Sequence, residues 1–184
     1  MRITGGIARG IPLQTGRRTD VRPATDMMRQ AVFSSLGPRV ETARCLDLFA
    51  GTGAYGLEAL SRGAASVRFV EQEREAVAAI AKNIQAVCKS MGADAACAEV
   101  EQRDVFTYKA AEASFDIVFA DPPYAMLPQR AREITRLAAS LLVQEGLLIF
   151  EMPGSVEVIS EELSLMKRLG KGKNDPSVCF FSKR

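Results

Sequence analysis

The sequence predicts an α/β domain in which a doubly wound, mostly parallel sheet carries helices on both faces. From Cys45 onward, short apolar runs of strand length alternate with longer segments of helical period, which is the strand, helix, strand order of a parallel sheet. The first strand runs into a glycine-rich turn and a helix, a connection typical of nucleotide-binding sheets. The 184 residues suffice for one such domain with a core of its own.

The first 40 residues differ from the rest, so we expect an extension at 1–40 and the α/β domain at 41–184. The segment "RITGGIARGIPLQTG" is rich in glycine and only mildly alternating, which predicts a short hairpin or an irregular arm. Thr25 is a suitable N-cap for a helix over 26–36, and Gly37-Pro38 would end it.

Within the α/β part, apolar runs predict strands and the 3.6-residue period predicts helices. The expected order is strand 45–50, helix 54–62 ending at Gly63, strand 66–71, a helix with an apolar stripe at Val77, Ile80, Ile84 and Val87, strands 97–103 and 115–120, a helix through Ile134, Leu137, Ala138, Leu141 and Leu142, strand 146–151, and a closing hairpin of 163–169 with 177–182.

Composition excludes several kinds of chemistry. The chain has no histidine, which removes Ser-His and Cys-His nucleophilic pairs and the commonest general base. Its four cysteines show no C-x-x-C spacing, so we expect small buried side chains and no metal. No signal-like start and no apolar run of membrane-spanning length is present, so we expect a cytoplasmic protein without membrane contact.

The net charge of +2 is unevenly distributed. Residues 1–44 carry eight Lys/Arg against three Asp/Glu, residues 167–184 carry six against one, and the middle of the chain is therefore acidic. Basic ends on an acidic body suit a polyanion held at its edges, because phosphate contacts give affinity without sequence preference. Solvated tails explain the charges equally well.

The glycine-rich turn has the pattern G-x-G-x-x-G from Gly51 to Gly56. Gly51 and Gly53 would permit a tight turn and close backbone approach to a ligand, and Gly56 would let the helix pack near the sheet. Glu71 ends the second strand 20 positions after Gly51, where a carboxylate can accept from both ribose hydroxyls. Together these residues predict a cofactor that carries a nucleoside.

Two further acids favour S-adenosylmethionine over a dinucleotide. Asp47 lies in the first strand, and a carboxylate near the cofactor suits a sulfonium and an ammonium group but repels a pyrophosphate. Asp104 closes the third strand and is placed to accept from an adenine amino group. The alternative for each is a structural acid that accepts from nearby backbone N–H groups.

The motif Asp121-Pro122-Pro123-Tyr124 follows the apolar strand "FDIVFA", at the strand end where ligands of parallel sheets bind. The two prolines stiffen the loop and leave their carbonyls as acceptors only. Asp121 and the Pro122 carbonyl are suited to hold the two hydrogens of an exocyclic amino group, while Tyr124 stacks on the base. Read alone, the same four residues are an ordinary turn.

These motifs carry a resemblance over nearly the whole chain. "RPATDMMRQAVFSSL", "LDLFAGTGAYGLEALSRGA", "FVEQ" and "FDIVFADPPY" resemble class I S-adenosylmethionine-dependent methyltransferases of the amino-group type. They are most similar to the RsmD family, which methylates N2 of a guanine in 16S ribosomal RNA. The resemblance implies a Rossmann-like sheet of seven strands, a monomer, and 16S rRNA, within a small-subunit ribonucleoprotein particle, as the substrate.

The resemblance also assigns residues to roles. It implies a cofactor site of Asp47, Phe49, Gly51, Gly53, Glu71, Asp104, Val105, Arg22 and Thr25. It implies a catalytic loop of Asp121, Pro122, Pro123 and Tyr124, and RNA contacts from Arg9, Arg17, Arg18 and Arg29. Arg22 suits either the methionine carboxylate or RNA phosphates. In the tail, Leu169 precedes Gly170 where the family usually has Tyr-Gly, so no substrate contact is expected to carry over there.

Three other functions remain possible on the sequence. A DNA adenine-N6 or cytosine-N4 methyltransferase would use the same loop, although about 40 residues before the first strand leave little room for a region that reads DNA sequence. A nucleotide-binding oxidoreductase would share the glycine loop but give Asp121 to Tyr124 no role. A non-catalytic nucleotide- or RNA-binding module would explain the basic ends alone.

Overall fold

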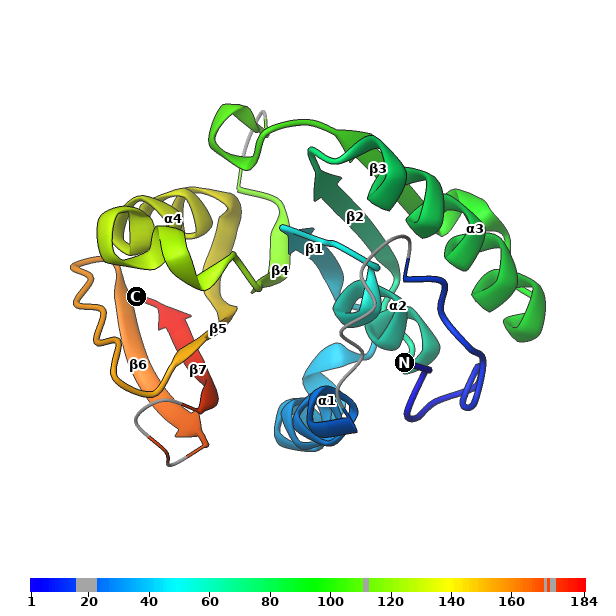
Figure 1. Ribbon diagram of the computed structural model, residues 1–184, viewed down its shortest axis with the longest axis horizontal. Helices are drawn as coiled ribbons and strands as arrows, with labels where there is room; N and C mark the ends of the chain where they lie inside the picture. The colour runs from blue at the N-terminus through cyan, green and yellow to red at the C-terminus, as the bar shows by residue number, and fades with distance from the viewer. Residues whose placement is uncertain (16–22, 111–112, 171, 173–174) are drawn as a thin grey trace.

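The computed structural model describes residues 1–15, 23–110, 113–170, 172 and 175–184, with the backbone alone for 23–25. Its centre is a seven-stranded sheet in the order β3-β2-β1-β4-β5-β7-β6 (Figure 1). The strands are β1 (Arg44–Leu48), β2 (Ser66–Glu71), β3 (Ala98–Gln102), β4 (Phe115–Ala120), β5 (Leu142–Pro153), β6 (Leu163–Leu169) and β7 (Pro176–Lys183). The five strands β1 to β5 pair in parallel, and β7 pairs antiparallel with β5 and β6. The predicted mostly parallel sheet and its closing hairpin are confirmed.

Helices cover both faces of the sheet. The helices are α1 (Pro23–Leu36), α2 (Ala54–Ser61), α3 (Arg74–Met91) and α4 (Leu127–Leu141), with 3₁₀ turns at Gly37–Val40, Ala95–Cys97, Val105–Thr107 and Tyr124–Met126. Alternate residues of each central strand enter two different cores: Cys45 faces a core shared with α1, α2 and α3, and Leu46 faces a core shared with α4. This alternation is the doubly wound arrangement that the long apolar strands predict.

The strand order reverses at β1. From β1 the chain moves outward through β2 and β3, and then returns to place β4 on the other side of β1 (Figure 1). Ligands of open parallel sheets bind outside the carboxyl ends of the strands at such a reversal. The fold therefore directs attention to the loops that follow β1 and β4.

The N-terminal extension shares the core of the α/β part. Ile3, Leu13 and Phe33 are buried in the same cluster as residues of β1 and α2, and a single bridge between Arg2 and Pro12 is paired in the arm. Backbone hydrogen bonds from Ile3 to Ile11, from Gly10 to Ile3 and from Leu13 to Met1 flank this antiparallel bridge, so the expected short hairpin is present in an irregular form. The described residues of the extension thus pack on the α/β part, with residues 1–15 lying against α2 and α3 (Figure 1).

Several element boundaries differ from expectation. Helix α1 begins at Pro23, so Thr25 lies in its first turn and is not the N-cap; a proline suits this start because its missing N–H has no partner there. Strand β5 begins at Leu142, four residues earlier than predicted, and its register with β4 shifts between Phe115 and Ile117. Glu145, at φ 62°, lies in this irregular start, which hid the strand from the apolar pattern.

None of the helices in the described part of the chain combines the length and apolar character that a membrane crossing requires. Over the same residues, no group of three or more cysteine or acidic side chains gathers where a metal ion could bind.

Candidate active site

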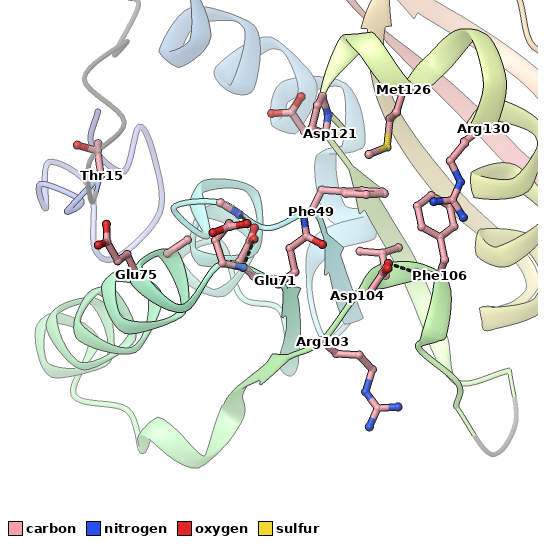
Figure 2. Close-up of a pocket in the computed structure, with 16 residues that line it drawn as sticks. Thr15, Phe49, Glu71, Glu75, Arg103, Asp104, Phe106, Asp121, Met126 and Arg130 are labelled. Atoms are coloured by element: carbon pink, nitrogen blue, oxygen red, sulfur yellow. Dashed lines mark hydrogen bonds between the residues drawn. The ribbon is translucent and has the colours of Figure 1, made fainter.

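A cavity of about 370 Å³ opens at the carboxyl edge of the sheet, where the strand order reverses (Figure 2). It is lined by Gly51 from the loop after β1, Glu71 from the end of β2, Asp104 after β3 and Asp121 after β4. Figure 2 shows it extending from Thr15 and Glu75 at one end to Phe106 and Arg130 at the other. Its volume falls in the usual range for small-molecule sites.

Glu71 fastens the glycine loop to the end of β2. Its Oε2 accepts from the backbone N–H of Gly51 at 2.8 Å, and its Oε1 accepts from the N–H of Glu73 at 2.9 Å. The side chain is 8% exposed and lines the cavity. Because each carboxylate oxygen has two lone pairs, both oxygens retain capacity to accept from a ligand hydroxyl.

The three glycines of the loop have different tasks. Gly51 lines the cavity, as the sequence predicts for a residue that lets a ligand approach the backbone. Gly53 is not among the lining residues; it adopts φ 74°, and an added Cβ would lie 3.2 Å from the Phe69 ring. At Gly56 an added Cβ would overlap the Phe69 ring and Val67, so its predicted role in close packing of α2 on the sheet is confirmed.

Asp47 is buried beneath the cavity and does not line it. It is 2% exposed, and its Oδ2 accepts from the N–H of Gly56 at 2.9 Å. Burial raises the pKa of Asp47 to about 8, although the hydrogen bond from Gly56 opposes the shift. The structure thus shows Asp47 in the structural role that was its alternative, where it positions α2 behind the glycine loop, and its place in the cofactor site stays a prediction.

One end of the cavity is lined by aromatic rings and the turn after β3. Asp104 caps the turn at Val105–Thr107 by accepting from the N–H of Phe106 at 2.9 Å, and Asp104, Val105 and Phe106 all line the cavity. Phe49 meets Phe106 edge to face with ring centroids 5.9 Å apart, and the Arg130 guanidinium lies 3.2 Å from the Phe106 centroid (Figure 2). Phe49 has φ 58°, a conformation that a bulky residue adopts rarely and mostly where a site requires it.

Carboxylates dominate the wall of the cavity. The acidic lining residues are Glu71, Glu73, Glu75, Asp104 and Asp121, and the basic ones are Arg103 and Arg130. This excess of negative charge favours a ligand with cationic groups and disfavours a pyrophosphate. The electrostatic preference that the sequence assigned to Asp47 therefore comes from other acids.

The loop after β4 combines a turn with a site. Asp121 and Pro123 line the cavity, whereas Pro122 is buried. The carbonyl of Pro123 accepts from the N–H of Met126 at 3.0 Å, so the 3₁₀ turn uses this one of the two proline carbonyls. Tyr124 is 37% exposed, and its hydroxyl donates to Glu151 Oε1 at 3.5 Å.

Two residues that the sequence did not single out support this loop. Glu151, at the end of the predicted strand "GLLIFE", also accepts at Oε2 from the Tyr55 hydroxyl at 2.9 Å. Tyr55 belongs to the glycine motif, and its ring stacks on Phe119 of β4 with centroids 5.4 Å apart. Glu151 resembles the predicted acids only in ending its predicted strand, since β5 continues to Pro153.

The arginines that were expected to contact RNA differ in their exposure. Arg9 is exposed, in keeping with that role, whereas Arg17, Arg18 and Arg22 lie outside the described residues and the Thr25 side chain is likewise not described. For Arg29 the expectation is wrong: it is 2% exposed, pairs with Glu58 at 3.3 Å and Asp26 at 2.9 Å, and donates to the carbonyl of Arg2. A cation buried among carboxylates and a carbonyl is unavailable to phosphate.

The basic C-terminal end also serves the fold. Arg168 donates to the carbonyls of Gly154 and Val156, and Lys183 donates to the carbonyl of Leu142. Lys167 reaches Ser35 of α1 at 2.8 Å. These contacts join β6 to α1 and to the segment after β5, and β7 to the start of β5, so the charge of this segment is weaker support for a polyanion surface than the sequence suggests.

Known proteins resemble this chain along its whole length. The model of the family described as "Conserved hypothetical protein 95" matches residues 1–181. The chain is 38% identical over 125 residues to "Ribosomal RNA small subunit methyltransferase D" of Escherichia coli (strain K12), an alignment that spans 67% of this chain and 60% of the relative. The protein of the same name in Haemophilus influenzae is 34% identical over 124 residues, covering 67% of this chain and 64% of that relative.

The solved structure of the Escherichia coli protein yhhF superimposes on this chain with a TM-score of 0.81 and 30% identity, covering all of this chain and 97% of that one. The sheet order, the two helical layers and the loop sites correspond to the Rossmann-like fold of class I methyltransferases. With the family model matching nearly every residue, the chain belongs to the Conserved hypothetical protein 95 family, which is the RsmD family of methyltransferases.

Proposed function

We propose that this protein is an S-adenosylmethionine-dependent methyltransferase that modifies the exocyclic N2 amino group of a guanine in the RNA of the small ribosomal subunit. The observation that carries the proposal is that Asp121 of the Asp-Pro-Pro-Tyr loop lines the same acid-rich cavity as Glu71 and Asp104. The relatives named as small-subunit rRNA methyltransferases support the RNA class. The expected 16S rRNA substrate within a ribonucleoprotein particle, the monomeric state and the cytoplasmic location belong to the same proposal.

The lining residues fit such a cofactor. Glu71 would accept from the ribose hydroxyls, and the end of the cavity lined by Phe49, Asp104, Val105 and Phe106 would hold the adenine. The acids of the wall would stabilise the positive charges at the methionine end. When bound, the cofactor supplies a methyl group activated by attachment to a sulfonium.

The catalytic loop would act by positioning the amine. Asp121 and the carbonyl of Pro122 would accept the two N–H groups of the guanine N2, which directs the nitrogen lone pair toward the cavity. The negative charge of Asp121 would also stabilise the positive charge that develops on nitrogen during transfer. Tyr124, more than a third exposed, would stack on the base.

Transfer of a labelled methyl group to small-subunit RNA, followed by mass spectrometry of the modified nucleoside, tests the proposal. We expect N2-methylguanine from the wild-type protein, and a loss of about 100-fold or more in turnover for Asp121→Ala with cofactor affinity close to wild type. Asp121→Asn, which keeps one acceptor, should lie between the two. Methyl transfer to another base, or an Asp121→Ala variant that no longer binds the cofactor, would contradict these assignments.

A further inference from the structure

Glu151 lies beside Asp121 at the carboxyl edge of the sheet. Strands β4 and β5 are parallel, and their last registered pair is Ala120 with Phe150, so Asp121 and Glu151 are the next residue of each chain segment. Side chains alternate along a strand, which places Glu151 on the face of Ile149 and Phe119, where Tyr55 packs. Burial is the main cause of the raised pKa of Tyr55, and the charges of Glu151 and Asp121 add to it.

Two tyrosine hydroxyls orient the Glu151 carboxylate and leave it able to accept further hydrogen bonds. Tyr55 donates to one oxygen at 2.9 Å and Tyr124 to the other at 3.5 Å. A carboxylate accepts about four hydrogen bonds, so each oxygen retains one lone pair. Glu151 is only partly buried, it does not line the cavity itself, and its partner Tyr124 belongs to the loop that would hold the base.

Burial and the neighbouring groups act on the pKa of Glu151 in opposite directions. Burial raises this pKa above its ordinary value, although the hydrogen bonds from Tyr55 and Tyr124 and the charge of Arg29 oppose the shift. Arg29 itself is held by Glu58 and Asp26 on the same side of the sheet. The surroundings therefore supply an acceptor that is fixed in direction.

The bases that carry an exocyclic amino group differ at the neighbouring ring nitrogen. In guanine the N2 amino group stands next to N1–H, which is a donor. In adenine and cytosine the corresponding ring nitrogen, N1 or N3, presents a lone pair. A carboxylate beside the amino-binding acid attracts the first arrangement and repels the other two.

We propose that Glu151 is the specificity-determining residue of this site: it accepts the N1–H of the target guanine while Asp121 and Pro122 hold its N2 amino group. This assignment rests on the proposed function and deepens it, since it explains how a loop suited to any amino base selects guanine. Tyr55 is then a positioning residue, because it holds the carboxylate and does not contact the base.

The test compares two RNA substrates that differ at the target nucleotide, first located by mass spectrometry: one with guanine and one with 2-aminopurine. The analogue keeps the 2-amino group but has a lone pair at N1. Wild-type protein should prefer guanine in kcat/KM by roughly tenfold or more, because a site built to accept a hydrogen bond rejects a ligand without the donor. Glu151→Gln, whose amide offers an N–H to that lone pair, should reduce the preference by about tenfold.

Glu157→Gln is the matched control, since Glu157 is an exposed carboxylate on the segment that follows β5. It should leave the guanine preference unchanged. The loss of O6 in 2-aminopurine affects all variants alike, so the change in preference isolates the contact at N1. Tyr55→Phe should lower turnover on both substrates while the preference stays closer to wild type.

The outcomes separate the two proposals. A Glu151→Gln variant that loses activity equally on both substrates would show a structural role only and overturn the assignment. A wild-type protein that transfers no methyl group to the guanine substrate would instead overturn the proposed function. Thermal unfolding of each variant is measured beside the kinetics and identifies a misfolded variant. If Glu151→Gln is misfolded, Glu151→Asp replaces it. Aspartate keeps the charge on a shorter side chain and should weaken the preference for guanine.

Discussion

The cofactor half of the site and the substrate half are held together in different ways. In the cofactor half, carboxylates accept from backbone N–H groups: Glu71 from Gly51 and Glu73, Asp104 from Phe106. In the substrate half, the carboxylate of Glu151 accepts from the side-chain hydroxyls of Tyr55 and Tyr124. One half is therefore fixed by loop geometry, and the other by side chains from separate elements.

This difference decides how each half should respond to substitution. A carboxylate that organises a loop through backbone groups shapes the loop as well as the ligand contact, so its removal should disturb everything the loop binds. A carboxylate held by hydroxyls can lose charge or length while the backbone around it remains in place. The cofactor half should thus fail in affinity, and the substrate half in turnover and selectivity.

Glu71→Ala gives the largest expected effect on the cofactor half. The change removes the acceptor for the N–H groups of Gly51 and Glu73 together with the proposed ribose contact. Hydrogen bonds to charged groups contribute about 1.5–3 kcal/mol each, so cofactor affinity should fall by about 100-fold, as measured by calorimetric titration. Glu75→Ala is the comparison from the same wall (Figure 2), and it should cost less affinity, because it removes one negative charge of the wall but keeps the acceptor of the Gly51 and Glu73 N–H groups. Equal losses for both variants would remove the special role of Glu71.

The same difference explains what the sequence could predict. Glu71, Gly51 and Asp104 follow strands at short, recognisable spacing, so the pattern that predicts the strands also finds these residues. Strand β5 begins irregularly near Glu145, and the partners of Glu151 come from positions 96 and 27 residues away, so no local pattern reports them. The pattern placed Asp47 correctly in its strand but did not predict that its side chain is buried. That burial depends on the packing of Gly56, whose N–H donates to the carboxylate.

The charge distribution of the sequence overstated the basic surface for a related reason. The basic residues at both ends of the chain count as surface charge in a sequence, yet Arg29 and Arg168 are used inside the fold. Their carbonyl and carboxylate partners lie on other elements, such as Glu58 on α2 and Gly154 after β5. Such partners become visible only when tertiary structure brings the segments together.

Asn83 provides an intermediate test, since it joins the N-terminal arm to the glycine loop. The side chain is 1% exposed, accepts from the N–H of Gln14 at 2.8 Å, and donates to the carbonyls of Gln14 and Thr52 at 3.0 Å each. Asn83→Leu leaves these backbone groups unpaired, which should cost about 1–3 kcal/mol of unfolding free energy and weaken cofactor binding severalfold. Chemical denaturation and cofactor titration measure the two effects.

Gln85→Leu is the matched control for Asn83, because Gln85 is exposed on the same helix. It should leave both quantities near wild type. A stable Asn83→Leu variant with unchanged cofactor affinity would show that the arm does not support the cavity, even though Thr15 lines it.

Asp47 should give the smallest effect on cofactor binding and a distinct effect of pH on stability. Burial raises its pKa to about 8, so between about pH 4 and pH 8 the folded protein keeps a proton that the unfolded chain releases. Its contribution to stability is therefore present at low pH and lost as pH rises through this window. Asp47→Asn, which can still accept from the N–H of Gly56, should abolish that contribution to the slope.

Thermal unfolding midpoints at pH 5 and pH 8 measure the slope for both proteins. The wild-type midpoint should fall more between these values than that of Asp47→Asn, by on the order of a few degrees. Cofactor affinity at a fixed pH should remain near wild type, because Asp47 does not line the cavity. A large loss of affinity in Asp47→Asn would instead return this acid to the cofactor site, and it would mean that the backbone-held half extends one layer deeper than the cavity wall.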